Sequence, residues 1–137
     1  MEQKPSPLRK VERSPEVIAA FAAMHEEREQ AERERPAVLA AGLDALKRLL
    51  AIAQGGSDQC RYVASFLLGL YNGTRFPFDL TDFRCLDRKI FNDCLSVLKM
   101  DFSPQKEVHA YFADGGRIFE QLAKDWNIPD RHLTNNQ

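Results

Sequence analysis

The sequence has few of the residues that build catalytic or metal-binding sites. Its 137 residues include three cysteines and three histidines, and none of them stands in a CxxC or HxxxH pair. A structural zinc site needs four such ligands at one point, and a small secreted domain usually carries an even set of paired cysteines. We therefore expect reduced thiols in a cytoplasmic protein, with no metal and no cofactor.

The chain also lacks a long apolar run and a dominant charge. Its longest apolar stretch, residues 62–71, is about half of the roughly 20 residues that span a bilayer. Residues 1–13 contain four basic side chains but not the apolar segment of a secretory signal. The 19 Lys and Arg balance 20 Asp and Glu, so no overall field draws the protein to nucleic acid or to a membrane.

Helical periodicity, in contrast, runs through most of the sequence. Apolar residues recur every three or four positions, and no stretch alternates with period two for long enough to predict a strand. Helices are expected at about residues 15–35, 36–53, 58–71, 80–100, 104–112 and 117–126. The pattern predicts an all-α fold, a compact bundle of about five to six helices with a charged N-terminal helical arm.

Helix start and stop signals divide the chain into three parts. Ser14-Pro15-Glu16 is a typical helix start, and Pro36 is expected to end that first helix because proline lacks an amide donor. Asn127 with Pro129 predicts the end of the last helix. We therefore expect a charged N-terminal arm and helix at 1–35, a helical core domain at 36–128 and a polar tail at 129–137.

The first expected helix carries little apolar surface. Its stripe consists of Val17, Phe21, Met24 and Ala31, and residues 26–35 are almost wholly charged. Such an acidic face can dock on a basic partner, and the thin stripe would also be explained if the helix packed on a second copy of the chain. A solvated face is the structural alternative.

No constellation of residues indicates an enzyme. Cys94 with His109 and Asp114 is a conceivable nucleophile, base and orienting acid, but Cys94 lies on an apolar stripe where burial raises the pKa of a thiol. Cys85 and Cys94 are expected on opposite faces of one helix. The glycine pairs at 55–56 and 115–116 lack the partners of a phosphate-binding loop. An enzyme whose site converges only in three dimensions stays open as an alternative.

A small nucleic-acid-binding regulator is a second alternative. Residues 105–112, the turn at 114–116 and residues 117–126 resemble a helix-turn-helix. The second helix would be the reader, yet Arg117 and Lys124 are balanced there by Glu120 and Asp125. A recognition helix normally brings surplus positive charge, so a protein partner is favoured over nucleic acid.

The loop before the fourth expected helix is the main candidate for that partner surface. Arginine and aromatic residues dominate binding hot spots, and both gather here. The candidate partner-binding residues are Arg75, Phe76, Phe78, Arg84, Asp87 and Arg88. In the structural alternative, Phe76 and Phe78 hold the loop on the core while the two later arginines pair with Asp82 or Asp87.

The stretch from Arg75 to Asp87, with Phe91-Asn92-Asp93-Cys94-Leu95 and the later Glu107-Val108-His109 and Trp126, resembles a family of short uncharacterised proteins. Members of that family are encoded on bacterial plasmids, integrative elements and phages, and the resemblance covers about residues 43–128. It implies a mobile-element setting and no activity. We therefore expect a non-enzymatic protein–protein interaction module that inhibits a host defence or regulatory protein.

Overall fold

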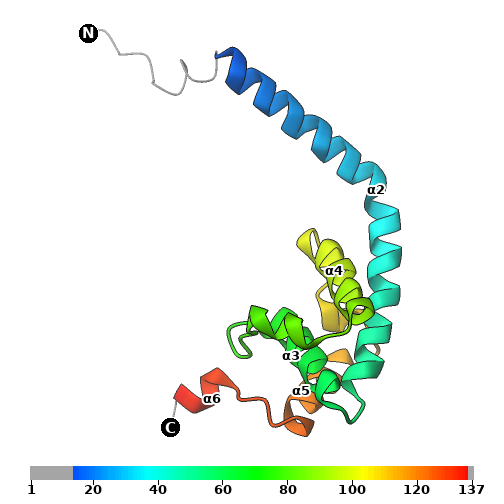
Figure 1. The fold of residues 1–137 in the computed structure, drawn as a ribbon, viewed down its shortest axis with the longest axis vertical. Coiled ribbons are helices and arrows are strands. Elements are labelled where there is room, and N and C mark those ends of the chain that lie inside the picture. Colours follow the sequence, from blue (N-terminus) through cyan, green and yellow to red (C-terminus); the bar gives the residue numbers. More distant parts are fainter. Residues whose placement is uncertain (1–13, 136–137) are drawn as a thin grey trace, which may run out of the picture. The chain divides into compact units, whose positions relative to one another are not determined.

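The computed structural model describes residues 14–135 (Figure 1). This part of the chain forms five α-helices and two 3₁₀ helices without a strand, which confirms the all-α prediction. The elements are α2 (Pro15–Ala53), α3 (Asp58–Asn72), η1 (Leu80–Cys85), α4 (Arg88–Phe102), η2 (Val108–Tyr111), α5 (Gly115–Asp125) and α6 (Arg131–Asn135). No helix in this part is long and apolar enough to cross a membrane. The basic residues expected in the arm, Lys4, Arg9, Lys10 and Arg13, lie outside the described residues.

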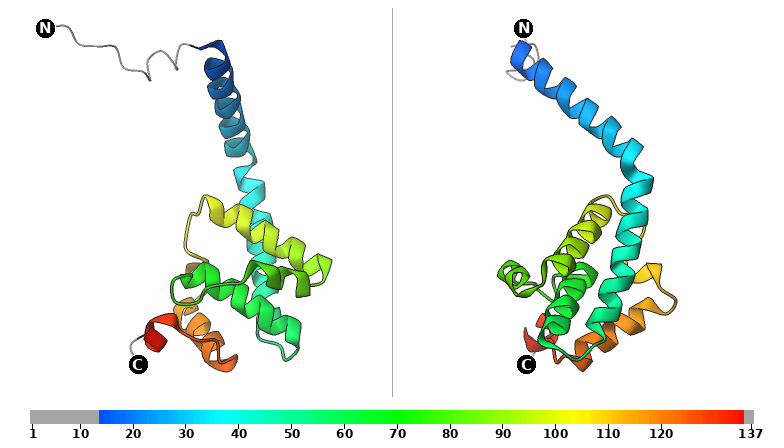
Figure 2. Two further views of the ribbon diagram at one scale, coloured as in Figure 1. Left: turned by 60° about the vertical axis from the view of Figure 1, so that its left-hand side comes forward. Right: turned by 45° about the vertical axis from the view of Figure 1, so that its right-hand side comes forward.

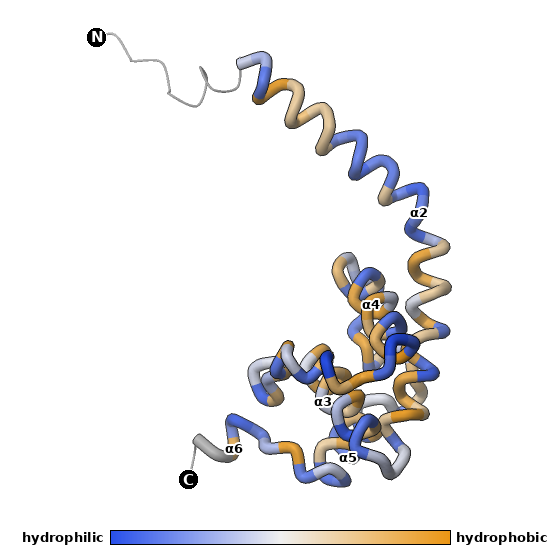
Figure 3. Tube along the Cα trace, in the orientation of Figure 1, coloured by the Kyte–Doolittle hydropathy of each residue, from blue (hydrophilic) through white to orange (hydrophobic). Residues whose placement is uncertain are grey.

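The chain divides into two units after Ala37. The described part of the first unit is the first half of α2, and none of its residues is buried. Its long hydrophilic run is visible in Figure 3. The second unit contains the hydrophobic core, to which α2, α3, α4 and α5 all contribute buried side chains.

The expected helix break at Pro36 is wrong, because α2 continues through it without interruption. Proline removes one backbone hydrogen bond, to the carbonyl of Glu32 four residues earlier. Glu32 is exposed, so water can reach that carbonyl. The surrounding alanine, leucine, glutamate and arginine residues are strong helix formers, and they carry the helix across the defect.

The second half of α2 lies against α3, α4 and α5 in both views of Figure 2. Leu46 and Leu49 of α2 are fully buried, and they share the core with Leu67 of α3 and Phe119 of α5. α2 and α4 approach closely at Gly42, where an added Cβ would lie 2.5 Å from the Cβ of Met100. A glycine is therefore required at this helix contact.

The expected single helix at 80–100 is wrong, because it is divided into η1 and α4 with extended backbone at Leu86 and Asp87. The cause is a tertiary contact from α3. The side chain of Gln59 accepts a hydrogen bond from the Asp87 amide at 2.7 Å and donates to the Asp87 carboxylate at 3.1 Å. The division also separates Cys85 in η1 from Cys94 in α4, so the expectation that one helix carries both is wrong.

The segment after α4 differs from the prediction too. Ser103-Pro104 does not begin an α-helix, and the residues around the buried Val108 form only the short 3₁₀ helix η2. Gly115 and Gly116 do not precede the next helix but form its first turn. The resemblance to a helix-turn-helix is therefore wrong in its first helix.

Local bonds define other helix ends, and the expected helix end at Asn127 is confirmed. The Ser57 side chain caps α3 by accepting from the amide of Cys60. After α5, Asn127 adopts φ 51°, and the amides of Asn127 and Ile128 bond to Lys124 and Ala123, the Schellman pattern of a helix end. The indole N–H of Trp126 donates to the Ala53 carbonyl at 2.8 Å and joins this end to α2.

Candidate functional site

Arg75, the first of the candidate partner-binding residues, forms its hydrogen bonds within the protein. Its guanidinium donates two hydrogen bonds to the Glu120 carboxylate, at 2.7 and 2.8 Å, and two to Asp130, at 2.9 and 2.8 Å. These bonds lower the pKa of Glu120 to about 2 and lower that of Asp130. Arg75 therefore ties the end of α3 to α5 and to the segment before α6.

The same contact involves the first part of the expected polar tail at 129–137. The Asp130 side chain is largely buried against Arg75, the amide of Arg131 donates to the Arg75 carbonyl at 2.8 Å, and residues 131–135 form α6. Asp130 and Arg131 are therefore attached to the core through Arg75. Residues 136–137 of the expected tail lie outside the described residues.

Phe76 and Phe78 hold the loop on the core, as in the structural alternative. Phe76 is 2% exposed, and the Arg75 guanidinium lies 4.6 Å from the centre of its ring. Phe78 packs edge-on against Phe66 and Phe83, with ring centres 5.7 and 5.0 Å apart. Neither aromatic side chain projects freely from the surface to meet a partner.

Arg84, Asp87 and Arg88 are the exposed members of the candidate set. Asp87 is engaged by Gln59. Within residues 14–135, neither Arg84 nor Arg88 forms an ion pair. These two arginines are therefore available at the surface.

An apolar surface lies beside Arg88 on α4. Leu95 is 38% exposed, Leu98 36% and Phe102 90%, and their spacing places them on one helix face. We call these three residues the α4 strip. The opposite face of α4 carries the buried Cys94, Val97 and Met100 of the core.

The sequence interpretation of the α4 strip was incomplete. Phe91, Leu95 and Leu98 have the spacing of an apolar helix stripe, the pattern of a buried face, and the structure leaves Leu95 and Leu98 partly exposed. Phe102 was missed, although it continues the spacing of 91, 95 and 98 by one more turn. The spacing of Phe102 was a sequence signal for a longer apolar stripe, but the exposure of that stripe is seen only in the structure.

Positive charge borders one side of the α4 strip. Arg88 lies seven residues before Leu95, and Lys99 lies four residues after it, so both stand next to the strip on the helix surface. Both are exposed. Arg48 of α2, in contrast, is bound to the buried Asp93 of α4 at 2.9 Å.

The residues considered for catalysis do not assemble into a site. Cys94 is fully buried, and burial raises its pKa to about 12, as its position on the stripe predicted. Asp114 pairs with Arg117 at the exposed surface, while the Nδ1 atom of His109 is buried without a hydrogen-bond partner. No group of three or more Cys, His, Asp or Glu side chains in residues 14–135 is placed to hold a metal ion.

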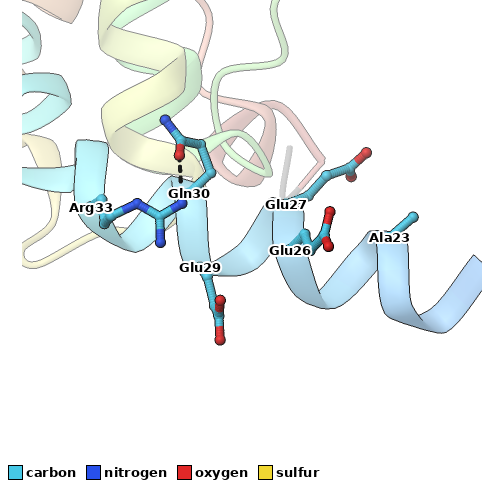
Figure 4. Close-up of a pocket in the computed structure, with 6 residues that line it drawn as sticks. All are labelled: Ala23, Glu26, Glu27, Glu29, Gln30 and Arg33. Carbon is cyan, nitrogen blue, oxygen red and sulfur yellow. Dashed lines mark hydrogen bonds between the residues drawn. The ribbon is translucent and has the colours of Figure 1, made fainter.

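The first half of α2 presents a second exposed surface. Ile18, Phe21 and Met24 are 55%, 57% and 47% exposed. A shallow hollow beside them is lined by Ala23, Glu26, Glu27, Glu29, Gln30 and Arg33. Figure 4 shows that all six side chains project from this one helix, so the hollow is a gap between neighbouring side chains and not an enclosed cavity.

Fold and surface together define a small all-helical protein with an exposed apolar helix face. The chain belongs to the family of unknown function DUF7673, whose model matches residues 43–127. This range contains the α4 strip, the Arg75 contacts with Glu120 and most of the core. No curated protein and no solved structure matches the chain.

Proposed function

We propose that this protein is a non-enzymatic protein–protein interaction module that binds its partner through the α4 strip. The observation that carries the proposal is the exposure of Leu95, Leu98 and Phe102 on one face of a helix whose other face is built into the core. A rigid helix presents such side chains in fixed positions, so little conformational entropy is lost on binding.

The energetics of the α4 strip favour a protein partner. Burying one large apolar side chain contributes about 1.5–3 kcal/mol, and Phe102 exposes nine-tenths of its surface. Aromatic residues at the centre of an interface commonly act as hot spots. Arg88 and Lys99 along one edge favour a partner that presents acidic residues there.

The resemblance to proteins of plasmids, integrative elements and phages extends the proposal to a biological role. In that setting the protein acts on a host or element-encoded protein and inhibits a defence or regulatory function. Phage plating on a bacterial host that expresses the protein tests this role. We expect phages to plate more efficiently on cells that express the natural chain than on cells without it. Cells that express Leu98→Glu should show no such increase. Equal plating with both chains contradicts it.

Site-specific crosslinking tests the proposed surface directly. Phe102 is replaced by benzoyl-phenylalanine, which retains an exposed aromatic group, and cells are irradiated. We expect one crosslinked species that disappears when Leu98→Glu is added to the same chain. The matched control places the same crosslinker at Leu133, which is 64% exposed on α6. Equal crosslinking from both positions, or insensitivity to Leu98→Glu, would show that the α4 strip is not the binding surface.

A further inference from the structure

The first half of α2 carries a surface that complements the α4 strip. We call residues 15–35 the acidic segment, because it contains six glutamates and three arginines and no other residue that is charged at neutral pH. Its large apolar side chains Ile18, Phe21 and Met24 follow each other at intervals of three residues and are about half exposed. The α4 strip is apolar with a basic edge, so the two surfaces match in both properties.

We infer that the α4 strip of one molecule binds the acidic segment of a second copy of the chain. This inference rests on the proposed function of the α4 strip and names its partner. Both complementary surfaces are present on the same chain, so the contact needs no other component. If each copy supplies its segment to the other, the two identical contacts close into a two-fold symmetric dimer.

The dimensions of the two surfaces agree. With a rise of about 1.5 Å per residue, Ile18 to Met24 spans about 9 Å and Leu95 to Phe102 about 10 Å. The intervals between successive apolar residues are also similar, three and three against three and four. Each apolar side chain of the acidic segment can therefore meet one of the α4 strip.

Charge decides the direction in which the helices run. Five of the six glutamates and all three arginines of the acidic segment follow Met24, so this part carries a net charge of −2, whereas Arg88 lies before Leu95. An antiparallel arrangement brings these opposite charges together, while a parallel arrangement separates them. The resulting pairs are Ile18 with Phe102, Phe21 with Leu98, Met24 with Leu95, and Glu32 with Arg88.

The acidic segment is also stabilised as a helix before it binds a partner. Its polar and charged side chains bond to one another along the helix, for example His25 with Glu29 at 2.9 Å, Gln30 with Glu34 at 2.7 Å and Glu32 with Arg35 at 3.5 Å. Such pairs at intervals of three or four residues stabilise a helix without tertiary packing. The apolar side chains are then left to bind the second copy.

Sedimentation velocity of the full chain tests the inference. We expect a dimer whose dissociation increases with salt, because exposed charge pairs are screened. Phe21→Glu and Leu98→Glu should each weaken self-association by at least about tenfold, as expected for a central interface residue. Leu133→Glu is the matched control and should leave the dimer intact. Far-ultraviolet circular dichroism checks that every variant keeps its helix content.

Mixing the two variants gives the decisive result. The Phe21→Glu chain retains an intact α4 strip, and the Leu98→Glu chain retains an intact acidic segment. Each alone should be monomeric, and an equimolar mixture should form a 1:1 complex through the one contact that remains. A mixture that stays monomeric overturns the inference, as does a natural chain that is monomeric at all concentrations.

A charge exchange tests the antiparallel pairing. Glu32→Arg and Arg88→Glu should each weaken the dimer, and the chain with both substitutions should recover it. Two weak single variants without recovery in the double variant overturn the assigned pairing. If the natural chain is monomeric but Phe102 still crosslinks to another protein in cells, the proposed function stands and only the second copy as partner is excluded.

Discussion

At the residue scale, the close packing around Gly115 leads to a specific prediction about stability. A Cβ added at Gly115 would lie 1.8 Å from the carbonyl oxygen of His109, whereas one added at Gly116 would meet nothing closer than 3.9 Å. The clash involves backbone, which cannot rotate away as a side chain can. We expect Gly115→Ala to lower the free energy of unfolding by about 1–3 kcal/mol, measured by urea denaturation.

Gly116→Ala is the matched control for this prediction. Both glycines lie in the first turn of α5, so both substitutions carry the same benefit of about 0.5–1 kcal/mol from replacing glycine by alanine in a helix. Only Gly115→Ala carries the clash with His109. Equal stability of the two variants would show that the turn before α5 adjusts its backbone without cost.

The candidate site at the residue scale was only partly predictable from sequence. The helix start at Ser14-Pro15-Glu16 was predicted because its signals are adjacent in the sequence, and α2 begins at Pro15. The intramolecular contacts of Arg75 were not predicted, because its partners Glu120 and Asp130 lie 45 and 55 residues away. An arginine next to aromatics has the same local pattern whether it binds a partner protein or the protein's own carboxylates.

At the element scale, α4 should respond differently to substitutions on its two faces. Val97 is fully buried and Phe102 is 90% exposed. Val97→Ala should lower the free energy of unfolding by about 1–3 kcal/mol through lost burial and the cavity that remains. Phe102→Ala should change it by no more than about 0.5 kcal/mol. Thermal denaturation at low protein concentration distinguishes the two, and a large loss with Phe102→Ala would indicate that a neighbouring element covers this face.

The contact of Arg75 with α5 predicts how stability depends on pH. The pKa of Glu120 is about 2 in the folded protein, below the value of about 4.3 for an unfolded glutamate. A lowered folded-state pKa adds stability above the unfolded-state value, and this stability is lost as the pH falls toward the folded-state value. The free energy of unfolding should therefore decrease from about pH 5 to pH 2.

Glu120→Gln should remove part of this pH dependence. It should also lower stability at neutral pH, on the order of 1 kcal/mol, since the contact is partly solvent-exposed and Asp130 continues to bind Arg75. Urea denaturation across the pH range measures both effects. Glu27→Gln, on an exposed part of α2, is the control. A natural chain whose stability is flat between pH 5 and pH 2 would contradict the role of this ion pair.

The helices themselves were predicted where local sequence decides and missed where tertiary contacts decide. The end of α5 at Asn127 follows from its own residues and was predicted. The break between η1 and α4 depends on Gln59 of α3, which no local pattern includes. Continuation of α2 through Pro36 shows the reverse case, in which strong helix formers on both sides outweigh a local helix breaker.

At the scale of the whole molecule, the fold class followed directly from periodicity, but the working surface did not. An apolar stripe predicts that a helix face is buried on average. It does not show whether another element of the fold lies against that face. The wide apolar face of α4 is covered on the side of Val97 and Met100 and open at the α4 strip. A surface of this kind becomes recognisable only when the whole arrangement of helices is known.

The separation into two units predicts the behaviour of a shortened chain. Among residues 14–135, the hydrophobic core uses none before Val38, so a chain that begins at Pro36 should fold cooperatively. Proline suits the first position of a helix, so the new end does not disturb α2. Its free energy of unfolding should differ from that of the monomeric full chain by no more than about 1 kcal/mol.

The dependence of the melting temperature on protein concentration then distinguishes the full chain from the shortened chain. Association of folded molecules raises the melting temperature as protein concentration increases, so the full chain should melt at a higher temperature when concentrated. The shortened chain lacks the acidic segment and should melt at the same temperature at every concentration. Circular dichroism at two widely separated concentrations measures this. A concentration-dependent melting temperature in the shortened chain would mean that its copies associate through the core unit alone, without Phe21 and its neighbours.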